Sequence, residues 1–162
     1  LGSLADQLFK MATLLAEGWM WIPYLLIVGW YFKKDRPMIF LAFLYSTLLT
    51  QIPKLFIWPN VTRPLASGID PQLIHRVSGV DIHTLSSFPS GHTATAFTIF
   101  ILTSYFFKNT WVVLIGFSYA LCAAYSRVYL AQHFPLDTAG GMIVALISFY
   151  LTYYTKRKYY NA

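Results

Sequence analysis

Three polar clusters interrupt an otherwise apolar sequence, and their residue types suit the binding and transfer of a phosphoryl group. One of them, Pro-Ser-Gly-His at residues 89–92, stands directly before an apolar run. The N-terminus of a helix exposes unpaired backbone N–H groups and the positive end of the helix dipole. Small residues there allow a phosphate to approach these groups closely. We therefore predict that Ser90 and Gly91 bind phosphate at the start of a helix.

The other two clusters contribute three cations. Lys54 and Arg63 belong to "KLFIWPNVTRP" at residues 54–64, and Arg127 belongs to "SRVYLAQHFPLD" at residues 126–137. Ionisable groups near a membrane interior are costly, and cations with few acids beside them require an anionic ligand. Arginine binds phosphoryl oxygens in a bidentate manner, whereas lysine supplies a point charge. We predict that all three bind phosphate, and for Lys54 the alternative is a side chain that only extends to the membrane interface.

Two histidines can perform the transfer. His133 and Asp137 are four residues apart, and Pro135 between them fits the first turn of a helix. The carboxylate would keep one ring nitrogen of His133 protonated and leave the other free to attack phosphorus. His92 is then the acid that protonates the departing oxygen. The predicted catalytic residues are His133, His92 and Asp137, and no metal ligand and no cofactor are predicted.

Apolar segments must position these residues. The chain has 162 residues, of which 57% are hydrophobic and only 11% charged, whereas soluble domains have about a quarter charged residues. Its apolar runs are continuous rather than alternating and approach the roughly 20 residues that a membrane-spanning helix needs. The sequence predicts an all-α, polytopic transmembrane helix bundle, as one domain over residues 1–162. Five spans are expected at about residues 12–32, 38–58, 88–107, 111–131 and 138–155, after a possible interfacial helix at residues 1–11.

The basic residues predict the orientation. With five alternating spans, one side of the membrane holds seven of them: Lys33, Lys34, Arg36, Lys108, Lys156, Arg157 and Lys158. That side should be cytoplasmic. The other side holds the loop at residues 59–87 and all three clusters, so we expect a multi-pass protein of the cytoplasmic (inner) membrane whose site faces the extracytoplasmic side, or the periplasm in a Gram-negative cell. The net charge of +6 does not indicate nucleic-acid binding, because the basic residues lie at the ends of spans.

The three clusters resemble the signature of the type 2 phosphatidic acid phosphatase superfamily, which includes vanadium haloperoxidases and bacterial acid phosphatases. That signature reads Lys-x6-Arg-Pro, Pro-Ser-Gly-His and Ser-Arg-x5-His-x3-Asp. The second and third parts match in full, whereas eight residues separate Lys54 from Arg63 in the first. The resemblance covers roughly residues 54–141. It implies a six-helix core with one N-terminal helix missing here, a phosphohistidine intermediate, no metal, and phosphorylated lipids as substrates.

We therefore expect a membrane lipid phosphatase that hydrolyses a phosphomonoester or pyrophosphate of a lipid, such as phosphatidic acid, phosphatidylglycerophosphate, a polyprenyl pyrophosphate or lipid A. Its partners would be that lipid and the membrane lipids, with no obligate protein partner. One alternative is a phosphotransferase in which a lipid alcohol replaces water. Another is a non-catalytic lipid-phosphate binding or carrier protein, which explains the cations but not the pairing of His133 with Asp137. His83 is either a solvated loop residue or a substrate contact, and Glu17 has no assigned role.

Overall fold

The computed structural model describes residues 2–81 and 83–159, and the regular secondary structure of these residues is entirely helical. The predicted all-α class is confirmed. The α-helices are α1 (Ser3–Leu14), α2 (Trp21–Tyr31), α3 (Arg36–Ile52), α4 (Gly91–Phe107), α5 (Thr110–Tyr129) and α6 (Pro135–Tyr159). The short 3-10 helices are η1 (Gly18–Met20), η2 (Lys33–Asp35), η4 (Pro64–Ala66) and η5 (Pro71–Leu73), and η3 (Pro53–Ile57) is a π-helix.

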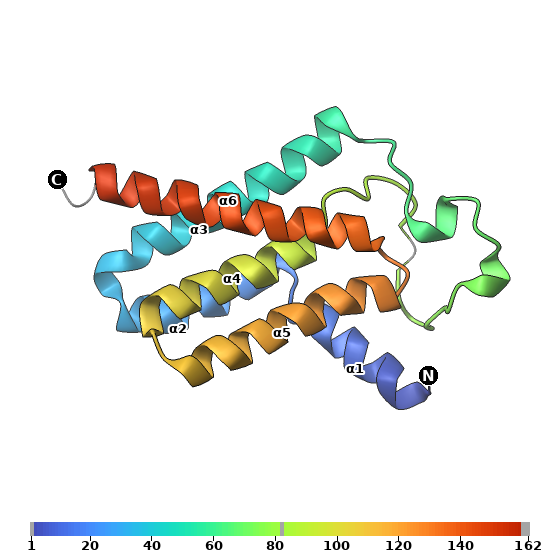
Figure 1. Cartoon of the computed structure of the whole chain (residues 1–162), viewed down its shortest axis with the longest axis horizontal. Helices are drawn as coiled ribbons and strands as arrows, with labels where there is room; N and C mark the ends of the chain where they lie inside the picture. The colour runs from blue at the N-terminus through green and yellow to red at the C-terminus, as the bar shows by residue number, and fades with distance from the viewer. Residues whose placement is uncertain (1, 82, 160–162) are drawn as a thin grey trace.

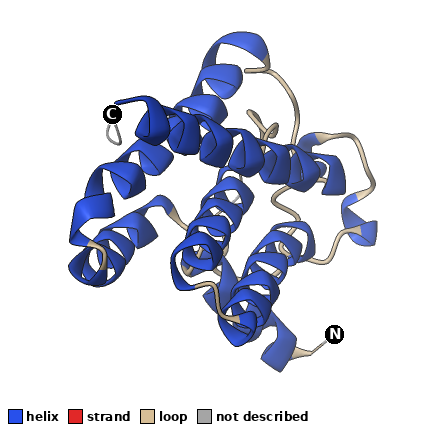
Figure 2. Ribbon diagram, turned by 60° about the vertical axis from the view of Figure 1, so that its left-hand side comes forward, coloured by secondary structure: helices blue, strands red, loops and turns tan. Residues whose placement is uncertain are grey.

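Helix α4 lies at the centre of the bundle and packs against α3, α5 and α6. Its fully buried side chains include Ala94, Ala96 and Leu102. Figure 1 shows the start of α4 at the same end of the bundle as the chain's N-terminus and the long connection from α3 to α4, with the end of α6 at the opposite end. Figure 2 shows this connection running along one side of the helices. The Pro-Ser-Gly-His cluster therefore lies at the end of the bundle that carries the long loop.

Three helical segments are long and apolar enough to cross a membrane: Lys33–Ile57, Thr110–Tyr129 and Pro135–Tyr159. They correspond to the spans expected at residues 38–58, 111–131 and 138–155. Helix α4 has 17 residues, which is about 26 Å at 1.5 Å per residue and somewhat less than the roughly 30 Å of a hydrocarbon layer. The count of five spans stays a prediction.

The structure differs from the continuous first span expected at residues 12–32. Helix α1 ends at Leu14, the chain turns, and the helical segment Gly18–Tyr31 continues at an angle of 57° to α1. Gly18 disfavours a helix interior, and Pro23 has no N–H to donate, which suits only the first turn of the new helix. The pair counts as a fourth candidate span if it is one broken span. The helix predicted for residues 1–11 therefore extends to Leu14, and its place at the interface stays a prediction.

Two glycines allow α6 to approach the start of α4. A Cβ on Gly141 would lie 2.6 Å from the carbonyl oxygen of Ser90, and one on Gly140 would lie 2.4 Å from the ring of Phe88. Neither position has room for a side chain. This close approach lets the Ser90 N–H donate to the carbonyl oxygen of Asp137 at 2.9 Å, which joins the second and third polar clusters directly.

Candidate active site

A cavity of about 470 Å³ brings together six of the eight predicted site residues. We call it the site cavity. The predicted residues that line it are Lys54, Arg63, Gly91, His92, Arg127 and His133. The other two, Ser90 and Asp137, are buried, and they hydrogen-bond to each other next to His133 of the lining. Residues from four separate parts of the sequence therefore meet in one place.

Lys54 reaches the start of α4 in spite of the longer spacing to Arg63. It lies in η3, where the Trp58 N–H donates to the Pro53 carbonyl oxygen at 2.7 Å, five residues back. A π-turn holds one residue more than an α-turn, which accommodates part of the longer spacing. A Cβ on Gly91 would lie 4.0 Å from Lys54 Nζ. The ammonium group of Lys54 therefore faces the N-terminus of α4, which is where a group that binds phosphate is expected.

Arg63 is fixed in the wall of the cavity by the loop around it. Its Nε donates to the Leu85 carbonyl oxygen at 3.0 Å, and its Nη1 donates to the Gln132 carbonyl oxygen at 3.1 Å. Gln132 is held in turn, because its Nε2 donates to the Asp81 carbonyl oxygen at 2.9 Å. Burial lowers the pKa of Arg63, and the charge of Asp137 opposes this. A guanidinium nevertheless stays charged at neutral pH.

Arg127 approaches the cavity from the last turn of α5. It is buried, and its Nη1 donates to Thr13 Oγ1 of α1. Its Nε is also buried and has no hydrogen-bond partner among the residues that the structure describes. A buried charged donor without a partner is costly. The position of Arg127 therefore suits an anionic ligand that supplies the missing acceptor.

His133 is held by the tight turn between α5 and α6. The backbone N–H groups of Gln132 and His133 both donate to the Arg127 carbonyl oxygen, at 2.9 and 3.1 Å. The imidazole is only 2% exposed. Its Nδ1 lies 3.4 Å from Asp137 Oδ2, as the four-residue spacing predicted. Nε2 is therefore the ring nitrogen left for a ligand in the cavity.

Ser87 is a site residue that the sequence analysis missed. Its hydroxyl donates to Asp137 Oδ2 at 2.5 Å and lies 3.4 Å from His133 Nδ1. The Phe134 N–H donates to the same carboxylate oxygen at 2.9 Å. Ser87 is fully buried and precedes the Pro-Ser-Gly-His cluster in "SSFPSGH". Its position next to this cluster was the only hint in the sequence of a role in the site. Its partner Asp137 lies 50 residues further along the chain, so no local pattern joins the two residues.

The surroundings of His133 keep its imidazole neutral at neutral pH. Burial lowers the pKa of His133 to about 4, and the positive charges of Arg63, Arg127 and Lys54 act in the same direction. The hydrogen bond to Asp137 opposes them. A neutral imidazole has a free electron pair on one nitrogen, which is the state that a nucleophile requires.

His92 has different surroundings in the first turn of α4. Its Nε2 is buried and has no hydrogen-bond partner within the described ranges. Glu17 Oε1 lies 3.8 Å from this nitrogen. His83 of the long loop is exposed and also lines the site cavity, which favours the substrate-contact alternative for that residue. His75, in contrast, pairs with Asp6 at 2.9 Å, away from the cavity.

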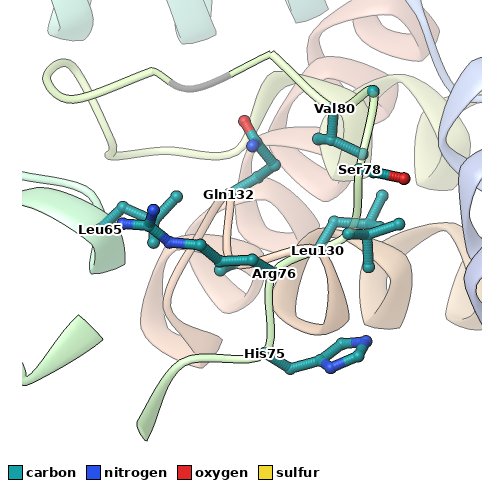
Figure 3. Close-up of a pocket in the computed structure, with 10 residues that line it drawn as sticks. Leu65, His75, Arg76, Ser78, Val80, Leu130 and Gln132 are labelled. Atoms are coloured by element: carbon teal, nitrogen blue, oxygen red, sulfur yellow. The ribbon is translucent and has the colours of Figure 1, made fainter. Parts of the chain in front are cut away.

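A separate cavity of about 320 Å³ lies between the long loop and the end of α5 (Figure 3). Figure 3 shows Arg76 extending toward Leu65 and the ring of His75 pointing the other way. The lining includes none of the eight predicted site residues. Within residues 2–81 and 83–159, no group of three or more histidine, cysteine or acidic side chains could hold a metal ion. That no metal and no cofactor take part stays a prediction.

The chain is similar to PAP2 proteins both in sequence and in structure. A sequence model of the PAP2 superfamily matches residues 24–160. The crystal structure of Aquifex aeolicus LpxE is similar, with a TM-score of 0.74 and 30% identity over 94% of this chain and 87% of that chain. The transmembrane PAP2 type phosphatidylglycerolphosphate phosphatase from Bacillus subtilis has a TM-score of 0.75 and 25% identity over 98% and 80% of the two chains. A lipid A 4'-phosphatase from Bacteroides thetaiotaomicron is 26% identical in an alignment 148 residues long that covers 86% of this chain and 65% of that protein.

Proposed function

Because the chain belongs to the PAP2 superfamily, we propose that it is a membrane lipid phosphatase that transfers the phosphoryl group of its substrate to His133. The observation that carries this proposal is the site cavity, where His92, His133, three cations and the start of α4 line one space of about 470 Å³. Two of the similar proteins are a lipid A 4'-phosphatase and a phosphatidylglycerolphosphate phosphatase. These names support a phosphorylated lipid as the substrate of this chain.

The phosphate binds between the cations and the N-terminus of α4. Lys54, Arg63 and Arg127 balance its negative charge, and the backbone N–H groups of the first turn have no acceptor within the helix. Ser90 contributes less directly than the sequence suggested. Its N–H already donates to Asp137, and its hydroxyl accepts from the Thr93 N–H at 3.4 Å as the N-cap of α4. Gly91 provides the close approach to the backbone.

In the first step, His133 Nε2 forms a bond to phosphorus, and the bond from phosphorus to the lipid oxygen breaks. The ring becomes positively charged as this bond forms. Asp137 stabilises that charge by accepting a hydrogen bond from Nδ1–H, while Ser87 and the Phe134 N–H hold the carboxylate in place. His92 gives its proton to the departing lipid oxygen.

In the second step, water attacks the phosphorus of the phosphohistidine. His92, now neutral, takes a proton from this water. The bond between nitrogen and phosphorus breaks, its electron pair returns to His133, and inorganic phosphate leaves. His92 is protonated again, so the site has returned to its starting state.

The hydrocarbon part of the lipid lies between α2 and α3. An apolar groove of about 370 Å³ runs there between side chains that include Leu25, Ile39 and Phe40. Gly18, Trp21 and Phe43 line this groove and also the site cavity. This shared boundary supports the binding of the tail and the phosphate of one lipid at the same time.

The proposed orientation puts the site at the extracytoplasmic face of the cell membrane. Several apolar helices and the similar transmembrane structure support a multi-pass membrane protein. Basic residues gather at the end opposite the site, where Lys156 pairs with Asp35 and Lys33 Nζ lies 5.0 Å from the centre of the Trp30 ring. By the positive-inside rule, that end is cytoplasmic.

A panel of lipid phosphates tests the proposed function. The purified chain in detergent is incubated, with a chelator, with phosphatidic acid, phosphatidylglycerophosphate, a polyprenyl pyrophosphate and lipid A. We expect the wild type and His75→Ala, which changes a histidine outside the site cavity, to release phosphate from at least one of them, and His133→Ala to release none. Equal release by His133→Ala would refute the role of His133. Binding of a lipid phosphate without any release would identify a carrier instead.

A further inference from the structure

His92 has to carry a proton in surroundings that are rich in positive charge. Charged or titratable groups reach it from every element around the start of α4, namely Lys54 of η3, Arg63 and His83 of the long loop, Arg127 of α5, His133 of the turn before α6 and Glu17 between α1 and η1. Lys10 and Asp81 line a neighbouring cavity that His92 also lines. Most of these groups repel a positive charge on the ring, whereas Glu17 is an acid whose Oε1 lies 3.8 Å from His92 Nε2.

We propose that Glu17 is a positioning residue that keeps His92 protonated until the lipid oxygen departs. This inference rests on the proposed function, since the acid role of His92 belongs to it. The distance of 3.8 Å between Glu17 Oε1 and His92 Nε2 is too long for a hydrogen bond. Glu17 therefore acts through its charge, and an opposite charge within about 4–6 Å favours the protonated form of an imidazole.

The contacts of α1 hold Glu17 in this position. Thr13 receives a hydrogen bond from Arg127, and the Tyr119 hydroxyl donates to the Leu15 carbonyl oxygen at 2.6 Å. Both bonds tie the end of α1 to α5. The carbonyl oxygen of Glu17 then accepts from the Met20 N–H at 3.0 Å at the start of η1. The break in the first helix therefore brings a carboxylate to the start of α4.

A second cavity adjoins both this carboxylate and His92. It has a volume of about 250 Å³, and we call it the outer cavity. Lys10, Glu17 and Gln132 line it, and it shares His92 and Arg127 with the site cavity. The Glu17 side chain is 41% exposed, so solvent reaches its carboxylate. The Glu17 carboxylate exchanges no proton in either step, while His92 gives one proton to the lipid oxygen and takes one from the attacking water.

Glu17→Gln removes the charge and keeps the shape of the side chain. For a short-chain phosphatidic acid, we expect kcat to fall about tenfold and the alkaline limb of the pH–rate profile to move about one unit to lower pH. For p-nitrophenyl phosphate, whose leaving group needs no proton, the loss should be less than about threefold. Glu17→Asp should restore part of the loss. Asp70→Asn, which removes a carboxylate from the exposed loop, should change neither quantity.

Equal losses on the two substrates, or an unmoved alkaline limb, would overturn the role of Glu17. A measurement without turnover separates this outcome from a failure of the proposed function. In protein labelled with ¹⁵N-histidine, with His92 assigned through His92→Asn, the protonation midpoint of His92 should lie about one unit lower in Glu17→Gln than in the wild type. Identical midpoints would overturn the inference. If the midpoint is lower in Glu17→Gln but the wild-type protein releases no phosphate, the proposed function is refuted and the coupling of Glu17 to His92 is retained.

Discussion

His133 and His92, two of the three histidines that line the site cavity, have opposite kinds of surroundings. The side of His133 is rigid, because Asp137, Ser87 and the turn at Arg127 fix both the ring and its carboxylate. The side of His92 is open, because its Nε2 has no hydrogen-bond partner in the described part of the chain and two cavities meet at its ring. The ring of His133 is therefore held in one orientation, whereas the ring of His92 is free to exchange a proton and to change its hydrogen-bond partner.

This difference follows from the two roles. A nucleophile must present the same nitrogen, without a proton, in every turnover, so fixed hydrogen bonds favour it. A residue that first donates a proton and then accepts one must reach a leaving group and later a water molecule. The open side of the cavity meets that requirement. Substitutions on the two sides should therefore have different consequences.

Loss of the nucleophile should have the largest effect. His133→Ala should lower kcat on the order of 10⁴-fold or more on every phosphorylated substrate, because no other group forms the covalent intermediate. The measurement is phosphate release from a monoester and from a pyrophosphate. Residual activity within tenfold of the wild type on either substrate would contradict the role of His133 as the nucleophile.

Loss of the acid should depend on the substrate. His92→Ala should lower kcat for a lipid phosphomonoester about 10²- to 10⁴-fold, because an alkoxide leaves poorly without a proton. A pyrophosphate expels a phosphate that is already stabilised, and its hydrolysis should fall much less. Equal losses on both substrates would count against His92 as the acid.

A smaller effect is expected at Ser87, on the rigid side. Ser87→Ala removes one hydrogen bond to the Asp137 carboxylate, a bond worth about 1.5–3 kcal/mol. We expect kcat to fall about tenfold or more with KM unchanged, since 1.4 kcal/mol corresponds to a factor of ten and Ser87 does not line the site cavity. Ser86→Ala is the matched control, because the Ser86 hydroxyl donates to the Pro59 carbonyl oxygen outside the site. A similar loss in both variants would indicate only a disturbed loop.

The smallest expected effect is a shift in the pH at which His133 gains a proton. Because burial lowers the pKa of His133 to about 4, its ring should stay neutral from pH 8 down to about pH 5 and gain a proton only near pH 4. NMR of ¹⁵N-histidine-labelled protein measures this midpoint. Asp137→Asn should move it lower still, because the hydrogen bond to the carboxylate raises the pKa. A midpoint near the ordinary value of about 6.5 would show that the ring is not held neutral in the way we describe.

The sequence predicted the class of fold, and six of the eight residues that it singled out line the site cavity, because each of the three clusters is a local pattern. Pro-Ser-Gly-His forms a helix start by itself, and the four residues from His133 to Asp137 define one turn. The contacts that complete the site join distant positions and leave no local pattern. Arg127 binds Thr13, 114 residues away, and Ser87 binds Asp137, 50 residues away.

The first span is the clearest difference between expectation and structure. Hydropathy does not distinguish one helix over residues 12–32 from two helices with a bend, since both are apolar. Glu17 therefore had no assigned role in the sequence, and only the 57° bend and the packing of α1 on α5 bring it to His92. Spacing along the chain locates groups within one helix, and the packing of several helices decides which groups meet.

Isolation of the covalent intermediate tests the central claim most directly. The protein is mixed with a ³²P-labelled lipid phosphate, quenched in alkaline denaturant and digested, and the labelled peptide is sequenced. We predict an alkali-stable, acid-labile label on His133 that accumulates further in His92→Ala with a pyrophosphate substrate, because that variant lacks the base for the second step. Label on another residue, or active protein that never retains label in either variant background, would contradict the account.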